Sequence, residues 1–136
     1  MDMAERFLQE KKADIIYFDR LTTADPEAPI KYAEGRSDEI RKCIGCLIGC
    51  GRPCAVNYDI QDQLIEMKPA EKPKKVLVIG GGVGGMEAAR IATLRGHKVT
   101  LLEKSPELGG MVQALARTKL TAEFQNIIDY LATQMR

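Results

Sequence analysis

Four cysteines lie close together in the first half of the chain, at Cys43, Cys46, Cys50 and Cys54. Cysteine thiolates bind iron and zinc, so four of them in one short segment predict a metal centre. Structural zinc sites usually join two Cys-x-x-Cys pairs that lie about a dozen or more residues apart, whereas closely spaced cysteines wrap around one compact cluster. The spacing therefore favours a [4Fe-4S] cluster over a zinc ion, and free or disulfide-bonded thiols are the third alternative.

A glycine-rich turn, Gly80 to Gly85, follows in the second half of the chain and fits the pattern G-x-G-x-x-G. It lies between an apolar run and a predicted helix, and an acid, Glu103, stands 23 residues after the first glycine. This context is typical of a dinucleotide site, in which the pyrophosphate approaches the backbone at Gly82 and meets the positive end of the helix. The alternative is a glycine turn that binds no ligand. The turn residues expected to contact the cofactor are Gly80, Gly82, Val83, Gly84 and Gly85.

The acid and a second glycine pair indicate which dinucleotide binds. Glu103 ends the second predicted strand, where a carboxylate accepts hydrogen bonds from the hydroxyls of an adenosine ribose. The residues after it, with Lys104 first and Gly109 and Gly110 at the end, resemble the second glycine pair of FAD-binding domains in two-dinucleotide flavoproteins. We therefore expect FAD, with NAD as the alternative. NADP is the least expected occupant, because the carboxylate would repel a 2′-phosphate.

A strand, a helix and a second strand must position these residues. Apolar runs predict strands at 76–79 and 99–102, and the residues between them predict a helix over 86–95 that ends at Gly96. A further helix is predicted over 121–134 with Thr121 as its N-cap. The pattern is that of a βαβ unit with a helix after it.

The N-terminal residues follow a different pattern. We expect a helix over 1–12, a buried strand at Ile15–Phe18, and a helix that starts at Asp25-Pro26 and is closed by Gly35. A short apolar strand between helices is typical of a parallel α/β sheet, whose neighbouring strands are missing here. A short apolar turn of helix is expected at 60–67.

Composition and charge argue against several classes of partner. The 136 residues are 45% hydrophobic and carry a net charge of +1, which suits a globular domain without an electrostatic footprint for nucleic acid. No apolar run approaches the ~18 residues that span a bilayer, and the N-terminus lacks the pattern of a signal peptide. We expect no nucleic-acid or membrane partner, and a cytoplasmic, reducing location in which structural disulfides are rare.

The order of these features resembles the NADH:flavin oxidoreductases, in the branch of 2,4-dienoyl-CoA reductase and trimethylamine dehydrogenase. The resemblance runs from Asp25-Pro26 through Gly35–Cys46 and Cys54–Asn57 to the glycine turn, and so covers essentially the whole chain. Members of this family join an FMN-binding barrel to a [4Fe-4S] cluster and then to FAD- and NAD(P)H-binding domains. The resemblance implies an α/β fold with four parts: the end of a TIM-barrel-like FMN domain (1–40), an iron–sulfur segment (41–67), a linker (68–74) and the first βαβ unit of a Rossmann-like domain (75–136).

The resemblance also implies site residues and a function. The four cysteines fall on the cluster ligands, and Arg20 falls where the last barrel strand contacts the FMN phosphate. Two positions depart from the family pattern: the separation between Cys50 and Cys54 is much shorter, and Asp19 replaces a glycine. The implied parent enzyme passes electrons between NAD(P)H, FAD, the cluster and FMN, and reduces an activated C=C bond of the 2,4-dienoyl-CoA or enoate type. In the trimethylamine dehydrogenase direction, electrons flow the other way.

No catalytic side chain is identified in this chain, so we expect the chain by itself to be inactive. We also expect it to form homo-oligomers or to contact the rest of a longer chain, because its predicted strands lack parallel neighbours. The alternatives from a different class are a non-catalytic electron-transfer subunit and a zinc-stapled nucleotide-binding module.

Overall fold

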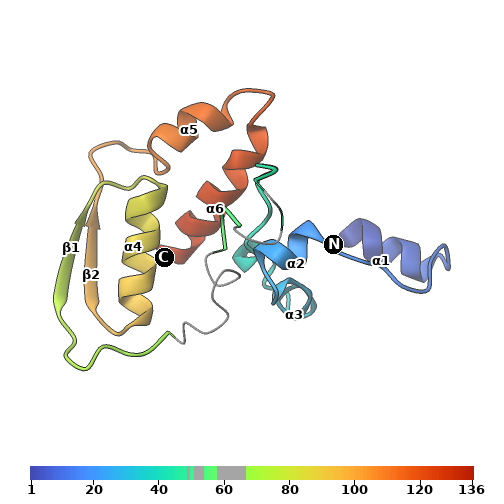
Figure 1. Cartoon of the computed structure of the whole chain (residues 1–136), viewed down its shortest axis with the longest axis horizontal. Coiled ribbons are helices and arrows are strands. Elements are labelled where there is room, and N and C mark those ends of the chain that lie inside the picture. Colours follow the sequence, from blue (N-terminus) through green and yellow to red (C-terminus); the bar gives the residue numbers. More distant parts are fainter. Residues whose placement is uncertain (49, 51–53, 58–66) are drawn as a thin grey trace.

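The computed structural model describes residues 1–48, 50, 54–57 and 67–136. A small parallel sheet lies at one end of the molecule, helices pack beside it, and an N-terminal helix projects at the other end (Figure 1). The helix predicted at 60–67 falls outside the described residues, apart from Met67. No helix in the described part of the chain is both long enough and apolar enough to cross a membrane.

The predicted βαβ unit is confirmed. Strands β1 (Lys75–Ile79) and β2 (Lys98–Leu102) pair in parallel, with Lys75 opposite Lys98 and Ile79 opposite Leu102. Helix α4 (Val83–Leu94) connects them and begins three residues before its predicted start. The strand-to-helix turn needs only Gly80 to Gly82, so the remaining residues of the glycine motif form the first helical turn.

Helices α4 and α6 (Gln125–Gln134) enclose the main core of the described chain. Partly buried and exposed residues alternate along β1 and β2. One face of the sheet therefore packs against α4, and the other face is exposed. The predicted apolar spacing of the last helix is confirmed, because it buries its apolar side against α4. The buried residues of this core are Met86, Ile127, Ile128, Tyr130 and Leu131.

The segment between the sheet and α6 differs from the prediction. Helix α5 (Met111–Ala116) was not expected, and the predicted helix over 121–134 is divided into a 3-10 turn, η3 (Ala122–Phe124), and α6. Thr121 stands at the N-cap position of η3, but its side chain makes no capping hydrogen bond, and its hydroxyl donates to the carbonyl of Leu115 at 2.6 Å. The hydroxyl of Thr121 thus bonds to the last turn of the preceding helix, α5, and not to an N–H of η3.

The predicted buried strand at Ile15–Phe18 is wrong. No described strand pairs with these residues, and Ile15 and Tyr17 are 85% and 84% exposed. A strand is stable only when a neighbour takes up its backbone hydrogen bonds, so an apolar run without one stays irregular. The predicted N-terminal helix is confirmed as α1 (Asp2–Gln9). Helix α2 (Arg20–Ala24) starts directly after the irregular run.

The next helix starts later than predicted but ends as expected. Helix α3 (Ala28–Ala33) begins after a turn in which the Asp25 carboxylate accepts from the Glu27 N–H at 3.1 Å. Gly35, at a φ of +75°, closes it, and the Arg36 N–H donates to the Lys31 carbonyl at 2.8 Å. A glycine in the left-handed region is a common helix end. A 3-10 turn, η1 (Ser37–Glu39), leads to the cysteine segment.

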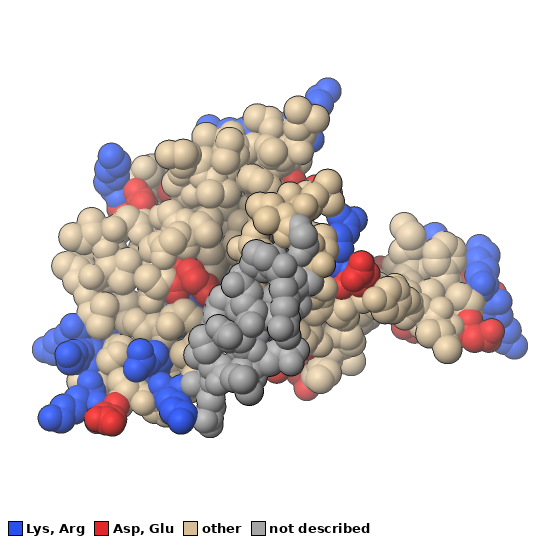
Figure 2. Space-filling model, viewed as in Figure 1, with Lys and Arg blue, Asp and Glu red and all other residues tan. Residues whose placement is uncertain are grey.

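Charged side chains form no broad patch of one sign on the face shown in Figure 2. Basic groups gather near the end of the sheet where β1 and β2 begin, and Lys75 and Lys98 start these strands. The glycine turn lies at the opposite end of the sheet, beyond the carboxyl ends of both strands.

Candidate dinucleotide and cluster site

The glycine turn places the N-terminus of α4 beyond the carboxyl end of β1. Gly80 has a φ of +104°, a conformation that L side chains rarely adopt, and Gly82 is the N-cap of α4. The first N–H groups of a helix have no partner within the helix, and the helix dipole adds partial positive charge there. The turn therefore presents a site suited to a pyrophosphate.

Three glycines of the turn differ in what a side chain would meet. A Cβ at Gly85 would clash with the carbonyl oxygen of Gly80, so this glycine is required for the helix to pack on the turn. At Gly82 the nearest atom is the Cα of Gly110 at 4.0 Å, and at Gly84 nothing lies within 4 Å. The fold alone has room for a methyl group at Gly82. A ligand that approaches this backbone explains why the position is a glycine.

Glu103 follows β2 and is bound to the glycine turn. Its Oε2 accepts from the Gly81 N–H at 2.5 Å, and its Oε1 accepts from the Ser105 N–H at 2.8 Å. These hydrogen bonds, the one from Ser105 first, hold the pKa of the Glu103 carboxyl below its usual value. Each carboxylate oxygen has a second lone pair, so Glu103 can still accept from ribose hydroxyls. Its negative charge disfavours a 2′-phosphate.

The second glycine pair lies directly against the first. The Gly109 N–H donates to the Gly81 carbonyl at 2.8 Å, and Gly109 also forms an isolated parallel bridge with Gly82. Sequence reasoning placed these glycines beside the cofactor, and the structure brings them to the same turn. Lys104 is exposed beside Glu103, whereas Val83 is partly buried at the edge of the core.

All four cysteines line one small cavity. Cys43, Cys46 and Cys54 are partly buried, Cys50 is exposed, and all four thiols are free. Among the described residues, no three His, Cys, Asp or Glu side chains are close enough to hold a single metal ion. The ligands of an iron–sulfur cluster bind separate irons and need not converge on one point as those of zinc do. Four thiols that line one cavity provide the donor set of a [4Fe-4S] cluster, and the cluster itself stays a prediction.

The backbone between the first two cysteines turns sharply and points an N–H at sulfur. Gly45 has a φ of +64°, and its N–H donates to the Cys43 Sγ at 3.3 Å. Hydrogen bonds to ligand sulfurs tune the reduction potential of a cluster. The carboxylate of Glu123, from η3, lies against Gly45 and would clash with a side chain there. No sequence pattern pointed to Glu123.

The cysteine segment is attached to the core of the dinucleotide unit. Ile44 and Val56 pack against the hydrophobic core between α4 and α6. The Asn126 Nδ2 donates to the Cys43 carbonyl at 2.9 Å. Leu47 and Ile48 also line the cysteine cavity but are 74% and 59% exposed. The two predicted sites are therefore joined through α6, and Asn126 is a site residue that the sequence did not reveal.

Arg20 lies beside the cysteines. It is the first residue of α2, is exposed, and lines the same cavity as the four thiols. The strand that was expected to deliver it to an FMN phosphate does not form in the described chain. The role of Arg20 in FMN binding stays a prediction.

Comparison with known proteins identifies the family of the chain. Residues 45–130 match the family described as pyridine nucleotide-disulphide oxidoreductase. A metal reductase of Desulforamulus reducens is 41% identical over 144 residues, which cover 99% of this chain and 22% of the relative. A cinnamate reductase of Clostridium sporogenes is 47% identical over 110 residues, which cover 74% of this chain and 16% of the relative.

Solved structures extend the likeness to the fold. A 2-naphthoyl-CoA reductase, in complex with 2-naphthoyl-CoA, superposes with a TM-score of 0.90 at 38% identity. The match covers 98% of this chain and 22% of that one. The chain thus spans about a fifth of the length of the relatives it matches.

Proposed function

Since the chain belongs to the pyridine nucleotide-disulphide oxidoreductase family and is related to the NADH:flavin oxidoreductases, we propose that it holds a [4Fe-4S] cluster and the ADP half of FAD in an iron–sulfur flavoprotein. The relatives are oxidoreductases, and two of them are named for substrates that carry C=C bonds. The proposed parent activity is the NAD(P)H-dependent reduction of an activated C=C bond.

The observation that carries the proposal is the shared cavity of the four cysteines. Three of these thiols are partly buried, and their segment packs on the core through Ile44 and Val56. This partly buried apolar attachment would hold the thiolates in place and limit the access of water to them. The N–H of Gly45 adds a donor toward the Cys43 sulfur.

At the glycine turn, each residue has a separate task. The open backbone at Gly82 would admit the pyrophosphate, and the start of α4 would bind its negative charge. Glu103, fixed by Gly81 and Ser105, would accept hydrogen bonds from the ribose. FAD is favoured over NAD because the second glycine pair lies against the turn.

The two candidate sites lie on one structural unit, which would suit electron transfer between a flavin and a cluster bound there. When bound, the flavin and the cluster would supply the exchange between two-electron and one-electron chemistry. The chain itself supplies positions: Asn126 of α6 holds the Cys43 carbonyl, and the other side of α6 packs on α4 behind the glycine turn. FMN, with Arg20 as a phosphate contact, belongs to the proposed parent enzyme, in which residues 1–40 would form the end of the FMN-binding barrel.

Metal and sulfide analysis tests the cluster. Protein prepared without oxygen should contain about four irons and four acid-labile sulfides per chain and should be brown. Stoichiometric zinc without sulfide would instead support the zinc-stapled module and reject the cluster. Cys50→Ser and Cys54→Ser, each compared with wild type, show which thiols are needed.

Calorimetry with ADP, FAD, NAD and NADP tests the dinucleotide site. ADP and FAD should bind, and NADP should bind most weakly because Glu103 carries a negative charge. Tighter binding of NADP than of NAD would contradict the role assigned to Glu103.

A further inference from the structure

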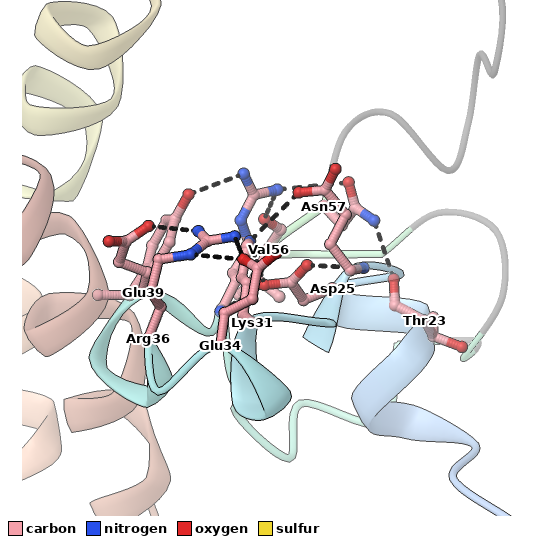
Figure 3. A network of polar contacts seen from close by, with 11 residues as sticks. Thr23, Asp25, Lys31, Glu34, Arg36, Glu39, Val56 and Asn57 are labelled. Atoms are coloured by element: carbon pink, nitrogen blue, oxygen red, sulfur yellow. Dashed lines mark hydrogen bonds and ion pairs between the residues drawn. The ribbon is translucent and has the colours of Figure 1, made fainter. Parts of the chain in front are cut away.

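A network of polar contacts around the buried residues Asp25, Arg41 and Asn57 connects three segments that are far apart in the sequence (Figure 3). The first segment is the turn from Thr23 to Lys31, the second consists of the residues on both sides of the cysteines, and the third is α6. Asp25 is 5% exposed and accepts from the Lys31 Nζ at 2.7 Å and from the Arg41 N–H at 2.9 Å. The network thus fixes the backbone just before the cysteine segment.

The Arg41 side chain contacts both the segment after the cysteines and α6. Its Nη1 donates to the Val56 carbonyl at 3.0 Å and to the Asn57 Oδ1 at 3.3 Å. Its Nη2 donates to the Tyr130 hydroxyl at 3.2 Å, and the guanidinium lies 5.0 Å from the centre of that ring. Arg41 is 8% exposed, so these contacts are shielded from water. A buried guanidinium with several acceptors is held in one geometry.

Arg41 and its partner Val56 stand on opposite sides of the four cysteines in the sequence. Arg41 stands two residues before Cys43, and Val56 stands two residues after Cys54. The hydrogen bond between Arg41 and Val56 therefore joins the two ends of the cysteine loop. Asn57 continues this closure, because its Nδ2 donates to the Thr23 carbonyl at 2.9 Å. Tyr130 belongs to α6, the helix that also holds Cys43 through Asn126.

We propose that Arg41 is a positioning residue for the iron–sulfur site: its side chain closes the cysteine loop at Val56 and fixes the closed loop to α6 of the dinucleotide unit through Tyr130. This inference rests on the proposed function for its cluster, but the loop closure is a property of the chain itself. Lysine cannot replace Arg41, because one ammonium group cannot reach acceptors on two elements in the planar geometry of a guanidinium.

The first experiment measures loop closure without a cluster. In the Cys46→Ser/Cys50→Ser protein, only the Cys43 and Cys54 thiols remain, and a short bis-maleimide links them at a rate that reports their proximity. Arg41→Lys and Tyr130→Phe should each slow this cross-linking, Arg41→Lys by about tenfold. The matched control is Arg36→Lys: Arg36 pairs with Glu34 and Glu39 and does not line the cysteine cavity. The control rate should equal that of the parent protein.

The second experiment uses the reconstituted cluster. Arg41→Lys and Arg41→Gln should both shift the reduction potential and alter the electron paramagnetic resonance spectrum of the reduced protein, and Arg36→Lys should change neither. If Arg41→Lys kept the wild-type reduction potential and spectrum while Arg41→Gln changed both, the positive charge alone would be sufficient. That result would overturn the proposal. Equal cross-linking rates for Arg41→Lys, Tyr130→Phe and the parent protein would overturn it too. If wild type builds no cluster, the proposed function fails, whereas the cross-linking rates still decide the role of Arg41.

Discussion

The backbones of Gly82 and Gly110 lie against each other, so that a Cβ on Gly110 would stand 3.2 Å from the Cα of Gly82. Gly82 caps α4, and Gly110 precedes α5, so this contact joins the two glycine motifs of the sequence. A ligand at the turn would meet backbone from both motifs. Two different roles of glycine meet at this contact. Gly110 is needed for the fold itself, whereas Gly82 is needed for a ligand to approach.

Gly82→Ala should weaken ADP binding while the protein stays folded. The structure has room for the new methyl group, since the nearest atom lies 4.0 Å away, but the methyl group would occupy the space through which a pyrophosphate approaches. Calorimetry with ADP and a thermal melt measure the two effects. Leu94→Ala is the control, because this exposed side chain lies at the other end of α4. Equal ADP affinity for Gly82→Ala and wild type would reject the assignment of the turn.

Gly110→Ala should destabilise the fold even without a ligand. Gly110 has a φ of +55° and a ψ of −132°, and a side chain in such a conformation costs roughly 1–3 kcal/mol. The close Cα of Gly82 adds to this cost. Urea unfolding should show the loss, whereas Gly84→Ala, inside α4, should leave the free energy of unfolding nearly unchanged or slightly higher. Unchanged stability of Gly110→Ala would mean that the two motifs are not in contact.

Glu103→Gln should lower stability at neutral pH, and the difference from wild type should shrink in acid. Hydrogen bonds from Ser105 and Gly81 lower the pKa of Glu103 in the folded protein. A group with a lowered folded pKa contributes stability above its unfolded pKa and loses that contribution as the pH falls through the folded pKa. Melting temperatures of both proteins from pH 7 down to pH 3 test this, with Glu107→Gln as the control. A constant difference across this range would contradict the carboxylate's role.

The elements that local sequence determines were predictable, and those that depend on distant contacts were not. The βαβ unit follows from apolar runs, glycines and one acid, and its strands pair as expected. Ile15–Phe18 has the apolar character of a strand, but the structure gives it no partner, and a strand without one does not form. Thr121 takes the predicted N-cap position, but its hydroxyl donates to the carbonyl of Leu115 and makes no capping hydrogen bond to η3.

In the candidate site, too, the residues of local motifs were predictable and those that act through distant contacts were not. The cysteines and the glycine turn were visible as motifs, because their spacing carries the chemistry. Arg41, Asn126 and Tyr130 were not, because each acts through a contact with a residue that is distant in the sequence, up to 89 positions away for Arg41 and Tyr130. Only the three-dimensional structure brings α6 to the cysteine segment.

Cys43→Ser should prevent cluster assembly, and Cys54→Ser should do so as well if the short loop supplies all four ligands. Both thiols are partly buried in the shared cavity, and each iron of a [4Fe-4S] cluster needs its own thiolate. Iron and sulfide content after anaerobic reconstitution measures the effect. A Cys54→Ser protein with a full cluster would mean that a group other than Cys54 binds the fourth iron.

The exposed face of the sheet should cause the chain to associate in solution. Leu77, Ile79 and Leu102 are 58%, 81% and 53% exposed, although parallel sheets are usually covered on both faces. Exposed apolar surface of this kind tends to be buried by another copy or another chain. Light scattering should therefore give a mass above that of one chain, and Ile79→Lys should shift it toward the monomer, because a buried lysine opposes association. The control Ile30→Lys changes an exposed residue of α3, which lies outside the sheet, and should leave the mass unchanged.

A monomeric wild type that also oxidises NADH in a dye-reduction assay would contradict both the expected association and the expected inactivity of this chain by itself.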